Sequence, residues 1–483
     1  MYLLRSNFSS FQMAEAGSIR CNDSGRISAQ GSLFSRHDLW GIASSETCTA
    51  MNWLGYGPEI RQARRDAYTD RDRMVTERAR GEVMQITTGS KGEGLTCFLE
   101  NDRDVIFAST RVICLEENVD ACDFSKETTV FRSYNRVCYP GHCILRLKRR
   151  GTTRISALKN ALCDNGYGRV FLSSKVYLKA MGIDKPKANT QKHPRAGPSV
   201  PRSYYGTLHT DTVPALRYYC PSILTKWAAR TRTWPPPKVV QDVVSLGAFL
   251  TPVGCKCSEV KDFEWRICFN TGEIELVTNL NDTQVKLYVL LKMLKKDVLK
   301  PRKKEITSFT LKNLVFWLAE KHPQALFHER SLFHWLHVGL DALRVAIDTR
   351  ELPYYMIPER NLMEGCDMDC EHQHMWISTI QDMMDEGPRV ILRLPKIRQT
   401  IIAHPEPLLW YSRRRTELEL LYLMDMNRRM QCRDKNWVYD TRDVIFKTIK
   451  RRKHEITYQV GLRMYIDGSS VNSLNDVWQS LLM

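Results

Sequence analysis

A chain of 483 residues is too long for one small hydrophobic core, so its length predicts two or three domains or lobes. Its 43% hydrophobic and 26% charged residues exclude disorder throughout, and its net charge of +17 favours a polyanionic partner, nucleic acid before an anionic membrane surface. Its 15 scattered cysteines and the lack of a long apolar run argue against a secreted disulfide scaffold or a membrane span, so we expect a soluble, cytoplasmic protein without membrane contact.

The first half of the chain predicts a mixed α/β lobe. Residues 1–50 are rich in small polar residues without a sustained period, and we expect a disordered tail there. From Glu59 to Glu82, an arginine-dense run of helix-forming residues without proline predicts a long exposed helix whose basic face meets a polyanion. Apolar, β-branched runs then predict strands, and a basic, proline-rich loop at 184–205 precedes the last of them. The expected strands are 83–87, 105–108, 111–115, 139–148 and 210–216.

Helical periodicity dominates the chain after the proline run at 235–237. Apolar residues recur at helical spacing over 273–299, 308–320 and 331–347, and the basic segment 410–483 has the same period. The predicted fold class is therefore α+β, with a mixed β-sheet lobe that carries a long N-terminal helix and a C-terminal helical lobe. The expected divisions are a tail at 1–50, the sheet lobe at 51–260, the helical lobe at 261–405 and a basic helical extension at 406–483.

Residues that suit phosphate and metal chemistry follow the first predicted strand. Gly89 and Ser90 form a turn at which backbone N–H groups and a hydroxyl approach a triphosphate, because glycine has no side chain in the way. Asp102 and Asp104 have the spacing that places two carboxylates on one face of a strand. A turn followed by solvated acids would be the commoner interpretation of these residues alone. A third acid on a later strand, Asp211, favours a site for two Mg²⁺ or Mn²⁺ ions.

Six sequence blocks connect the chain to a known family. In order they are GSKGEGL, NDRDVIF, DTVPAL, EWRICFNTGE, ITSFTLKNLVFW and LPYYMIPERNLM, and they lie between Gly81 and Met363. This order resembles the family that unites male-abnormal-twenty-one (Mab-21) proteins with cyclic GMP-AMP synthase. The resemblance implies a two-lobed nucleotidyltransferase fold with a long spine helix. It also implies a cytosolic, nucleic-acid-activated enzyme of innate immune sensing that joins ATP and GTP into a cyclic dinucleotide.

The resemblance also assigns roles to single residues. Asp102, Asp104 and Asp211 match the three metal-binding acids, which makes them the expected catalytic residues. Phe309 falls where cyclic GMP-AMP synthase has a base-stacking tyrosine, so the aromatic face is kept and the hydroxyl is lost. A phosphate-binding lysine is expected on the helix that carries Lys286 and Lys292, with Lys286 the first choice. The full set expected to bind nucleotide is Gly89, Ser90, Arg266, Lys286, Ser308 and Phe309.

The activator is expected to be double-stranded RNA or DNA, and an oligomer on the nucleic acid is left open. Residues 276–284 contain no His or Cys, whereas cyclic GMP-AMP synthase has a zinc insertion there that helps to clamp DNA. This difference puts DNA in doubt and leaves RNA open. The cations expected to contact a phosphate backbone are Arg61, Arg64, Arg65, Lys148, Arg149 and Arg150.

Three alternatives stay open at this point. Cys366, Cys370, His372 and His374 supply four potential zinc ligands, but their spacing is unlike that of the usual zinc fingers. The chain is alternatively a non-catalytic Mab-21-like binding or scaffold protein, a function that the three acids argue against. Template-independent addition of nucleotides to RNA ends requires the same metal site and is less favoured, because the helical lobe resembles the other branch.

Overall fold

The computed structural model describes most of the chain after residue 35. The described ranges are 36–100, 102–152, 155–181, 190–193, 197–204, 208–301, 305–364, 368–402, 405–434 and 438–468, with 473, 476–478 and 481. The chain divides into two compact units, each of which is described by itself. The first unit comprises Met1–Gly57, Asn281–Glu351 and Cys366–Arg413, and the second Pro58–Leu280, Leu352–Gly365 and Arg414–Met483. Helices and strands both build the chain, so the predicted α+β class is confirmed.

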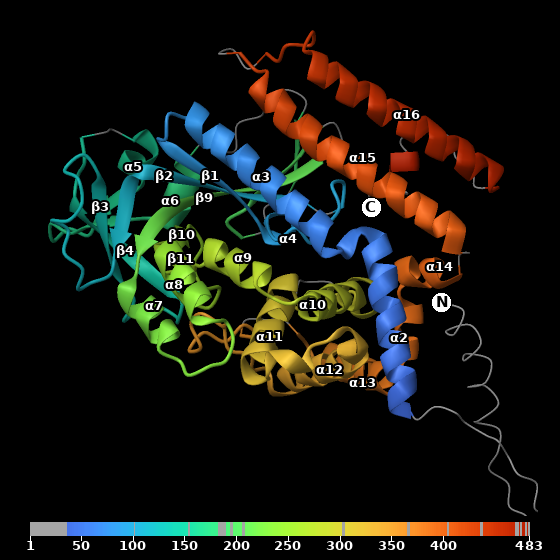
Figure 1. Ribbon diagram of the computed structural model, residues 1–483. Helices are drawn as coiled ribbons and strands as arrows, with labels where there is room; N and C mark the ends of the chain where they lie inside the picture. Colours follow the sequence, from blue (N-terminus) through green and yellow to red (C-terminus); the bar gives the residue numbers. More distant parts are fainter. Residues whose placement is uncertain are drawn as a thin grey trace, which may run out of the picture. The chain divides into compact units, whose positions relative to one another are not determined.

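A mixed β-sheet forms the centre of the second unit (Figure 1). Pairing runs in the order β1-β2-β3-β4-β11-β10-β9-β8-β7, and β2 also pairs directly with β9. All five predicted strands are present, two of them joined into the long strand β2. The strands are β1 Val83–Thr88, β2 Arg103–Leu115, β3 Thr129–Tyr134, β4 His142–Arg149, β5 Leu162–Asp164, β6 Val170–Leu172, β7 Thr190–Lys192, β8 Val200–Tyr204, β9 Leu208–Tyr219, β10 Ala248–Thr251 and β11 Glu264–Cys268.

The apolar face of β2 and β9 explains why these strands are central. Side chains alternate between the two faces of a strand, so Ile106 and Ala108 share a face of β2. With Ala215 of β9 and Phe249 of β10 they form a buried apolar cluster. Removing these side chains from water stabilises the pairing by about 25 cal/mol per Å² of buried apolar surface. Asp104 lies two residues before Ile106, and therefore at the end of the same face.

Helices flank the sheet of the second unit, and the longest of its first half is α3 (Pro58–Arg78), which confirms the predicted long helix. In Figure 1, α15 (Pro405–Gln431) runs along the outer side of α3, and α16 (Val444–Ile466) follows it. No helix in the described ranges has both the length and the apolar composition needed to cross a membrane. The remaining helices of this unit are α4 Gly89–Gly92, α5 Ser156–Ala161, α6 Ser174–Ala180, α7 Pro221–Ala228, α8 Pro237–Leu246 and α9 Asn270–Thr278.

The first unit is helical, and its first element corrects a prediction. Helix α2 (Arg36–Met51) occupies the end of the predicted disordered tail, so that prediction is wrong for residues 36–50; residues 1–35 lie outside the described ranges. Its buried side chains include Ala43, Ser44, Thr47 and Cys48, which are too small or too polar to produce an apolar stripe in the sequence. The Ser44 hydroxyl accepts a hydrogen bond from the Phe333 backbone N–H at 3.1 Å.

A second correction concerns the helix predicted over 273–299. The structure has two helices there, because α9 ends at Thr278 and α10 (Asp282–Leu294) begins after Asn281. The Asn281 side chain accepts a hydrogen bond from the Gln284 N–H at 3.0 Å, and the Gln284 side chain accepts one from the Asn281 N–H at 2.9 Å. This capping box starts a new helix at the boundary between the two units. The other helices of the first unit are α11 Ser308–Lys321, α12 Leu332–Thr349, α13 Cys370–Glu386 and α14 Pro395–Ile402.

Candidate active site

Two of the three predicted acids lie side by side on neighbouring strands. Asp104 is in register with Asp211, because β2 and β9 pair in parallel, and it faces Thr88 across the antiparallel pair with β1. Residues in register on adjacent strands point to the same face, with strands about 4.8 Å apart. The prediction that Asp211 lies on a strand next to the first two acids is therefore confirmed for Asp104. Two carboxylates in this arrangement repel each other unless a cation lies between them.

Asp102 is placed differently from the other two acids. It lies one residue before β2 begins and is exposed, so only Asp104 of the Asp-x-Asp pair is on the strand. Within the described ranges, no three His, Cys, Asp or Glu side chains are gathered closely enough to hold a metal ion. The backbone thus brings Asp104 and Asp211 together on β2 and β9, whereas Asp102 lies just before β2 begins.

The Gly89–Ser90 turn lies against the Asp104 carboxylate. Gly89 has a φ of +62°, and a Cβ added to it would overlap Asp104 Oδ2. Only glycine permits so close an approach of the backbone to that carboxylate. The donor set fits a metal-bound triphosphate, because carboxylate oxygens suit Mg²⁺ while the Ser90 hydroxyl and the backbone N–H groups suit phosphate oxygens. The donor types therefore suit a divalent ion with a triphosphate, but no third carboxylate is gathered beside Asp104 and Asp211 in the described ranges.

We expect Gly89→Ala to displace this turn. A left-handed backbone costs a residue with a Cβ about 1–2 kcal/mol, and the overlap with Asp104 adds to that cost. The second unit should melt several degrees lower than in the wild type. A matched control is Gly166→Ala, because Gly166 also has a positive φ but nothing lies within 4 Å of its added Cβ. Equal melting temperatures of the two variants would contradict the tight packing of Gly89 on Asp104.

Asp72 of helix α3 fixes the strand that leads into the turn. Its carboxylate accepts hydrogen bonds from the backbone N–H and the hydroxyl of Thr87, the latter at 2.9 Å. It also pairs with Arg103 at 3.1 Å, and Arg103 donates to the Thr87 hydroxyl at 2.7 Å. Arg103 is therefore held against α3 and β1, and its side chain lies on the opposite face of β2 from Asp104, because neighbouring side chains alternate along a strand. No sequence pattern singles out Asp72, which is one of several acids in an arginine-rich helix.

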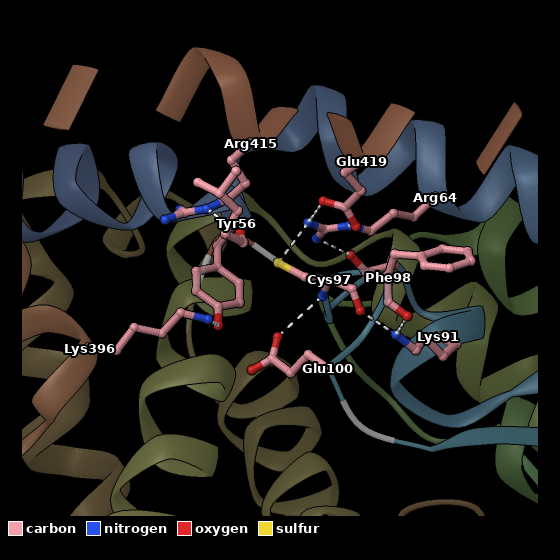
Figure 2. Close-up of polar contacts among 11 residues, drawn as sticks. Tyr56, Arg64, Lys91, Cys97, Phe98, Glu100, Lys396, Arg415 and Glu419 are labelled. Atoms are coloured by element: carbon pink, nitrogen blue, oxygen red, sulfur yellow. Dashed lines mark hydrogen bonds and ion pairs between the residues drawn. The ribbon is translucent and has the colours of Figure 1, made fainter. Parts of the chain in front are cut away.

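Lys91 holds the loop that follows the turn (Figure 2). Its buried ammonium group donates to the carbonyl oxygens of Cys97 and Phe98, the second at 2.9 Å. Glu100 accepts a hydrogen bond from the Cys97 N–H at 3.2 Å. Burial lowers the pKa of Lys91 to about 8, because the charged ammonium group loses its contact with water. Lys91 was missed in the sequence, although its place between two glycines of the turn marks it as close to the site.

The arginines of α3 do not form the exposed basic face that the sequence predicted. Arg64 is buried and forms a bidentate ion pair with Glu419 of α15, with N–O distances of 2.7 and 2.8 Å (Figure 2). Arg61 is also buried, and Arg65 is half-buried and donates to Gln62 at 2.5 Å. The expectation that Arg61 and Arg64 contact a phosphate backbone is therefore wrong. The physical reason is that α15, 355 residues away in sequence, covers this face.

The second predicted cation cluster divides between two roles. Lys148 and Arg150 are exposed at the end of β4 and remain candidates for phosphate contacts. Arg149 is half-buried and donates to the carbonyl oxygens of Phe124 and Ser125 at 2.8 and 2.7 Å. Its guanidinium group therefore stabilises a loop.

The residues predicted to bind nucleotide are divided between the two units. Arg266 lies on β11 in the second unit, where its Nε has no hydrogen-bond partner in the described ranges and burial lowers its pKa. In the first unit, Lys286 is buried and pairs with Asp282 at 2.5 Å. That partner argues against Lys286 as a phosphate ligand, whereas the Lys292 ammonium group lies 5.4 Å from the centre of the Tyr288 ring, and the phosphate-binding role stays a prediction for both lysines.

Ser308 and Phe309 open helix α11 in the first unit. The Ser308 carbonyl accepts a hydrogen bond from the Tyr288 hydroxyl at 3.2 Å. Phe309 is half-buried, and the Lys312 ammonium group lies 5.4 Å from the centre of its ring. Stacking of a nucleobase on the Phe309 ring stays a prediction.

The alternative zinc site is not assembled by the residues that can be described. Cys370 and His372 lie in the first turn of α13, and His372 Nδ1 contacts the Asp369 carboxylate at 2.8 Å. Cys366 lies outside the described ranges, so the four-ligand prediction stays untested.

The helical segment from α10 to the first turns of α13 has a recognisable relative. Residues 283–377 match the model of the Mab-21 protein HhH/H2TH-like domain. This match supports membership of the Mab-21 family. The Mab-21 domain family is generally nucleotidyltransferase-like. The match lies in the part of the chain that carries Lys286, Lys292, Ser308 and Phe309, whereas the acids lie before it.

Proposed function

We propose that the protein is a two-lobed nucleotidyltransferase of the cytosol that joins ATP- and GTP-type nucleoside triphosphates into a cyclic dinucleotide. The observation that carries the proposal is the register of Asp104 with Asp211, beside a glycine turn that leaves no room for a Cβ. Double-stranded RNA or DNA is the proposed activator, and a role in innate immune sensing follows from that activator. The Mab-21 match supports the helical lobe of the proposed fold.

Each half-reaction in the proposal forms one phosphodiester bond. A ribose hydroxyl attacks the α-phosphorus of a triphosphate, the bond to pyrophosphate breaks, and the hydroxyl proton leaves through the Asp211 carboxylate or water. Gly89 and Ser90 would orient the triphosphate, while Asp102, Asp104 and Asp211 would hold two Mg²⁺ or Mn²⁺ ions. When bound, the ions neutralise the leaving pyrophosphate and lower the pKa of the attacking hydroxyl. A second round between the ends of the linear product closes the ring, so two triphosphates release two pyrophosphates.

The test is an incubation of the purified full chain with all four α-³²P-labelled triphosphates, Mg²⁺ or Mn²⁺, and either duplex RNA or duplex DNA. We expect a phosphatase-resistant labelled dinucleotide that requires metal and one of the two duplexes. Label in lengthened RNA would instead identify terminal nucleotide addition. Nucleotide binding without any labelled product, under every combination of metal and duplex, would identify the non-catalytic Mab-21-like scaffold.

A further inference from the structure

A basic cavity lies in the second unit, beside the covered face of α3. It has a volume of about 880 Å³ and is lined by α3, α15, α16 and the loop that carries Phe98. Seven of its lining residues are Lys or Arg, and one, Asp425, is acidic. Known pockets for small molecules have volumes of about 300–1,000 Å³, so the cavity has the size of a ligand site.

The single acid in the lining does not compensate the cations, of which Arg451 pairs with Glu455 outside the cavity at 3.7 Å. Asp425 is already shared, because it accepts from Arg429 Nε at 3.1 Å and from Lys453 Nζ at 2.8 Å. Lys447 and Lys450 are exposed, and no acid pairs with either in the part of the chain that the structure describes. The positive charge at the cavity mouth is thus left for solvent ions or a ligand to neutralise.

Arg71 brings a further charge to the inner wall. Its Nε is buried without a hydrogen-bond partner in the described ranges, and its Nη1 donates to the Met426 carbonyl oxygen at 3.4 Å. Burial, followed by the charges of Arg103 and Arg433, lowers the pKa of Arg71 to about 10. Like charges held together in this way are stabilised by an anion that accepts hydrogen bonds from them.

The remaining wall is aromatic. Phe98 and Tyr422 are stacked with ring centres 5.2 Å apart, and Trp478 meets the Tyr422 ring edge-on at 5.9 Å. Lys453 Nζ lies 3.8 Å from the centre of the Tyr422 ring. Aromatic faces beside cations suit a ligand that combines a flat ring with phosphate groups.

We propose that this cavity binds a small organic polyphosphate, with the phosphates at Arg71 and the α16 lysines. A small molecule is favoured over a nucleic-acid duplex because the cations converge on a cavity, whereas a duplex presents phosphates spaced along a line. The cavity site is separate from Asp104 and Asp211, and its occupancy is measurable without turnover. The inference therefore stands or falls independently of the proposed catalysis.

The experiment is calorimetric titration of the full chain with ATP and with inositol hexakisphosphate. EDTA is present so that metal-dependent binding of triphosphate at the candidate active site is suppressed. The test variant is Lys447→Ala/Lys450→Ala/Arg451→Ala, which removes three exposed cations of α16. Lys159→Ala/Lys179→Ala is the control, because it removes two exposed cations from α5 and α6 that do not line the cavity.

We expect at least one probe to bind the wild type, and the α16 variant to lose affinity by about 30-fold or more because charge-assisted contacts are removed. The control should bind within about twofold of the wild type, as small differences correspond to well under 1 kcal/mol. Tighter binding of ATP than of inorganic tripolyphosphate would identify a nucleoside ligand, and equal binding would identify a ligand held by its phosphates alone.

Three outcomes would overturn the proposal. The first is that neither probe binds, and the second is that both bind the α16 variant as tightly as the wild type. The third is that the α16 variant loses affinity for duplex RNA although neither small probe binds, which would make the cavity mouth part of a nucleic-acid surface. We expect all variants to fold, because the substituted cations are exposed, and melting curves of each variant check this.

Discussion

Replacing Asp104 by Asn should lower cyclic dinucleotide synthesis by about three powers of ten or more, because the carboxylate supplies several kcal/mol of stabilisation through the bound ions. Asp211→Asn should have an effect of the same order, because it lies in register on the next strand. Asp102→Asn tests whether the exposed acid before β2 joins the site, and we expect it to be inactive as well. The matched control is Asp123→Asn in an exposed loop, which should keep full activity.

The same variants separate a metal site from a structural pair of acids. Without metal, Asp104→Asn and Asp211→Asn should melt at or slightly above the wild-type temperature, because one of two repelling charges is gone. The wild type should gain stability from Mg²⁺ with triphosphate, since a ligand of the folded state raises the melting temperature. If the wild type gains nothing and Asp211→Asn melts markedly lower, Asp211 is a structural hydrogen-bonding residue and the scaffold function is favoured.

Replacing Glu419 by Gln should destabilise the second unit by about 3–5 kcal/mol, because it leaves the Arg64 charge buried without its partner. The side chains of both residues are only 1% exposed, so water cannot replace the lost carboxylate. The measurement is urea unfolding of the full chain, read from the transition that melts α3 and α15. Hydrogen exchange of the α3 amides identifies that transition.

The control for this prediction is an ion pair on the same helix. Asp70 and Arg73 pair at 3.0 Å, but their side chains are 54% and 66% exposed, so Asp70→Asn should cost only about 0–1 kcal/mol. The double variant Arg64→Met/Glu419→Leu should recover most of the stability, because it buries apolar groups in place of both charges. If Glu419→Gln costs no more than Asp70→Asn, α15 is not anchored to α3 through this pair.

The sequence predicted those parts of the site that depend on local pattern. The strands around Asp104 and Asp211 were predicted because apolar and β-branched residues form short runs there. The position of Gly89 in a turn also follows from local chemistry. The exact register of Asp104 with Asp211 depends on a pairing between strands about a hundred residues apart, which no local pattern specifies.

The failures have the same physical origin. Arg64 was expected at the surface, because its neighbours are polar and its partner Glu419 lies in a distant segment. Lys286 was expected to face a phosphate, although it pairs with Asp282 one helical turn earlier. Ser44 was assigned to a tail, since a serine that accepts a hydrogen bond from Phe333 is indistinguishable in sequence from one in a loop. Arg64 and Ser44 thus depend on a tertiary partner and Lys286 on a partner in its own helix, so in each case the role is decided by a partner that the residue pattern does not show.

The two hydrogen bonds of Lys91 connect the Gly89–Ser90 turn to the loop at Cys97 and Phe98, so a shift of one is expected to move the other. The lysine belongs to α4, which begins at Gly89, and its acceptors are the carbonyls of Cys97 and Phe98. Phe98 in turn lines the basic cavity. A ligand in the cavity that binds more tightly to one placement of Phe98 should therefore change the affinity of the turn for a triphosphate. Thermodynamic linkage then requires the triphosphate to change the affinity of the cavity for its ligand by the same factor. This heterotropic coupling would allow the occupancy of one site to be titrated through the other.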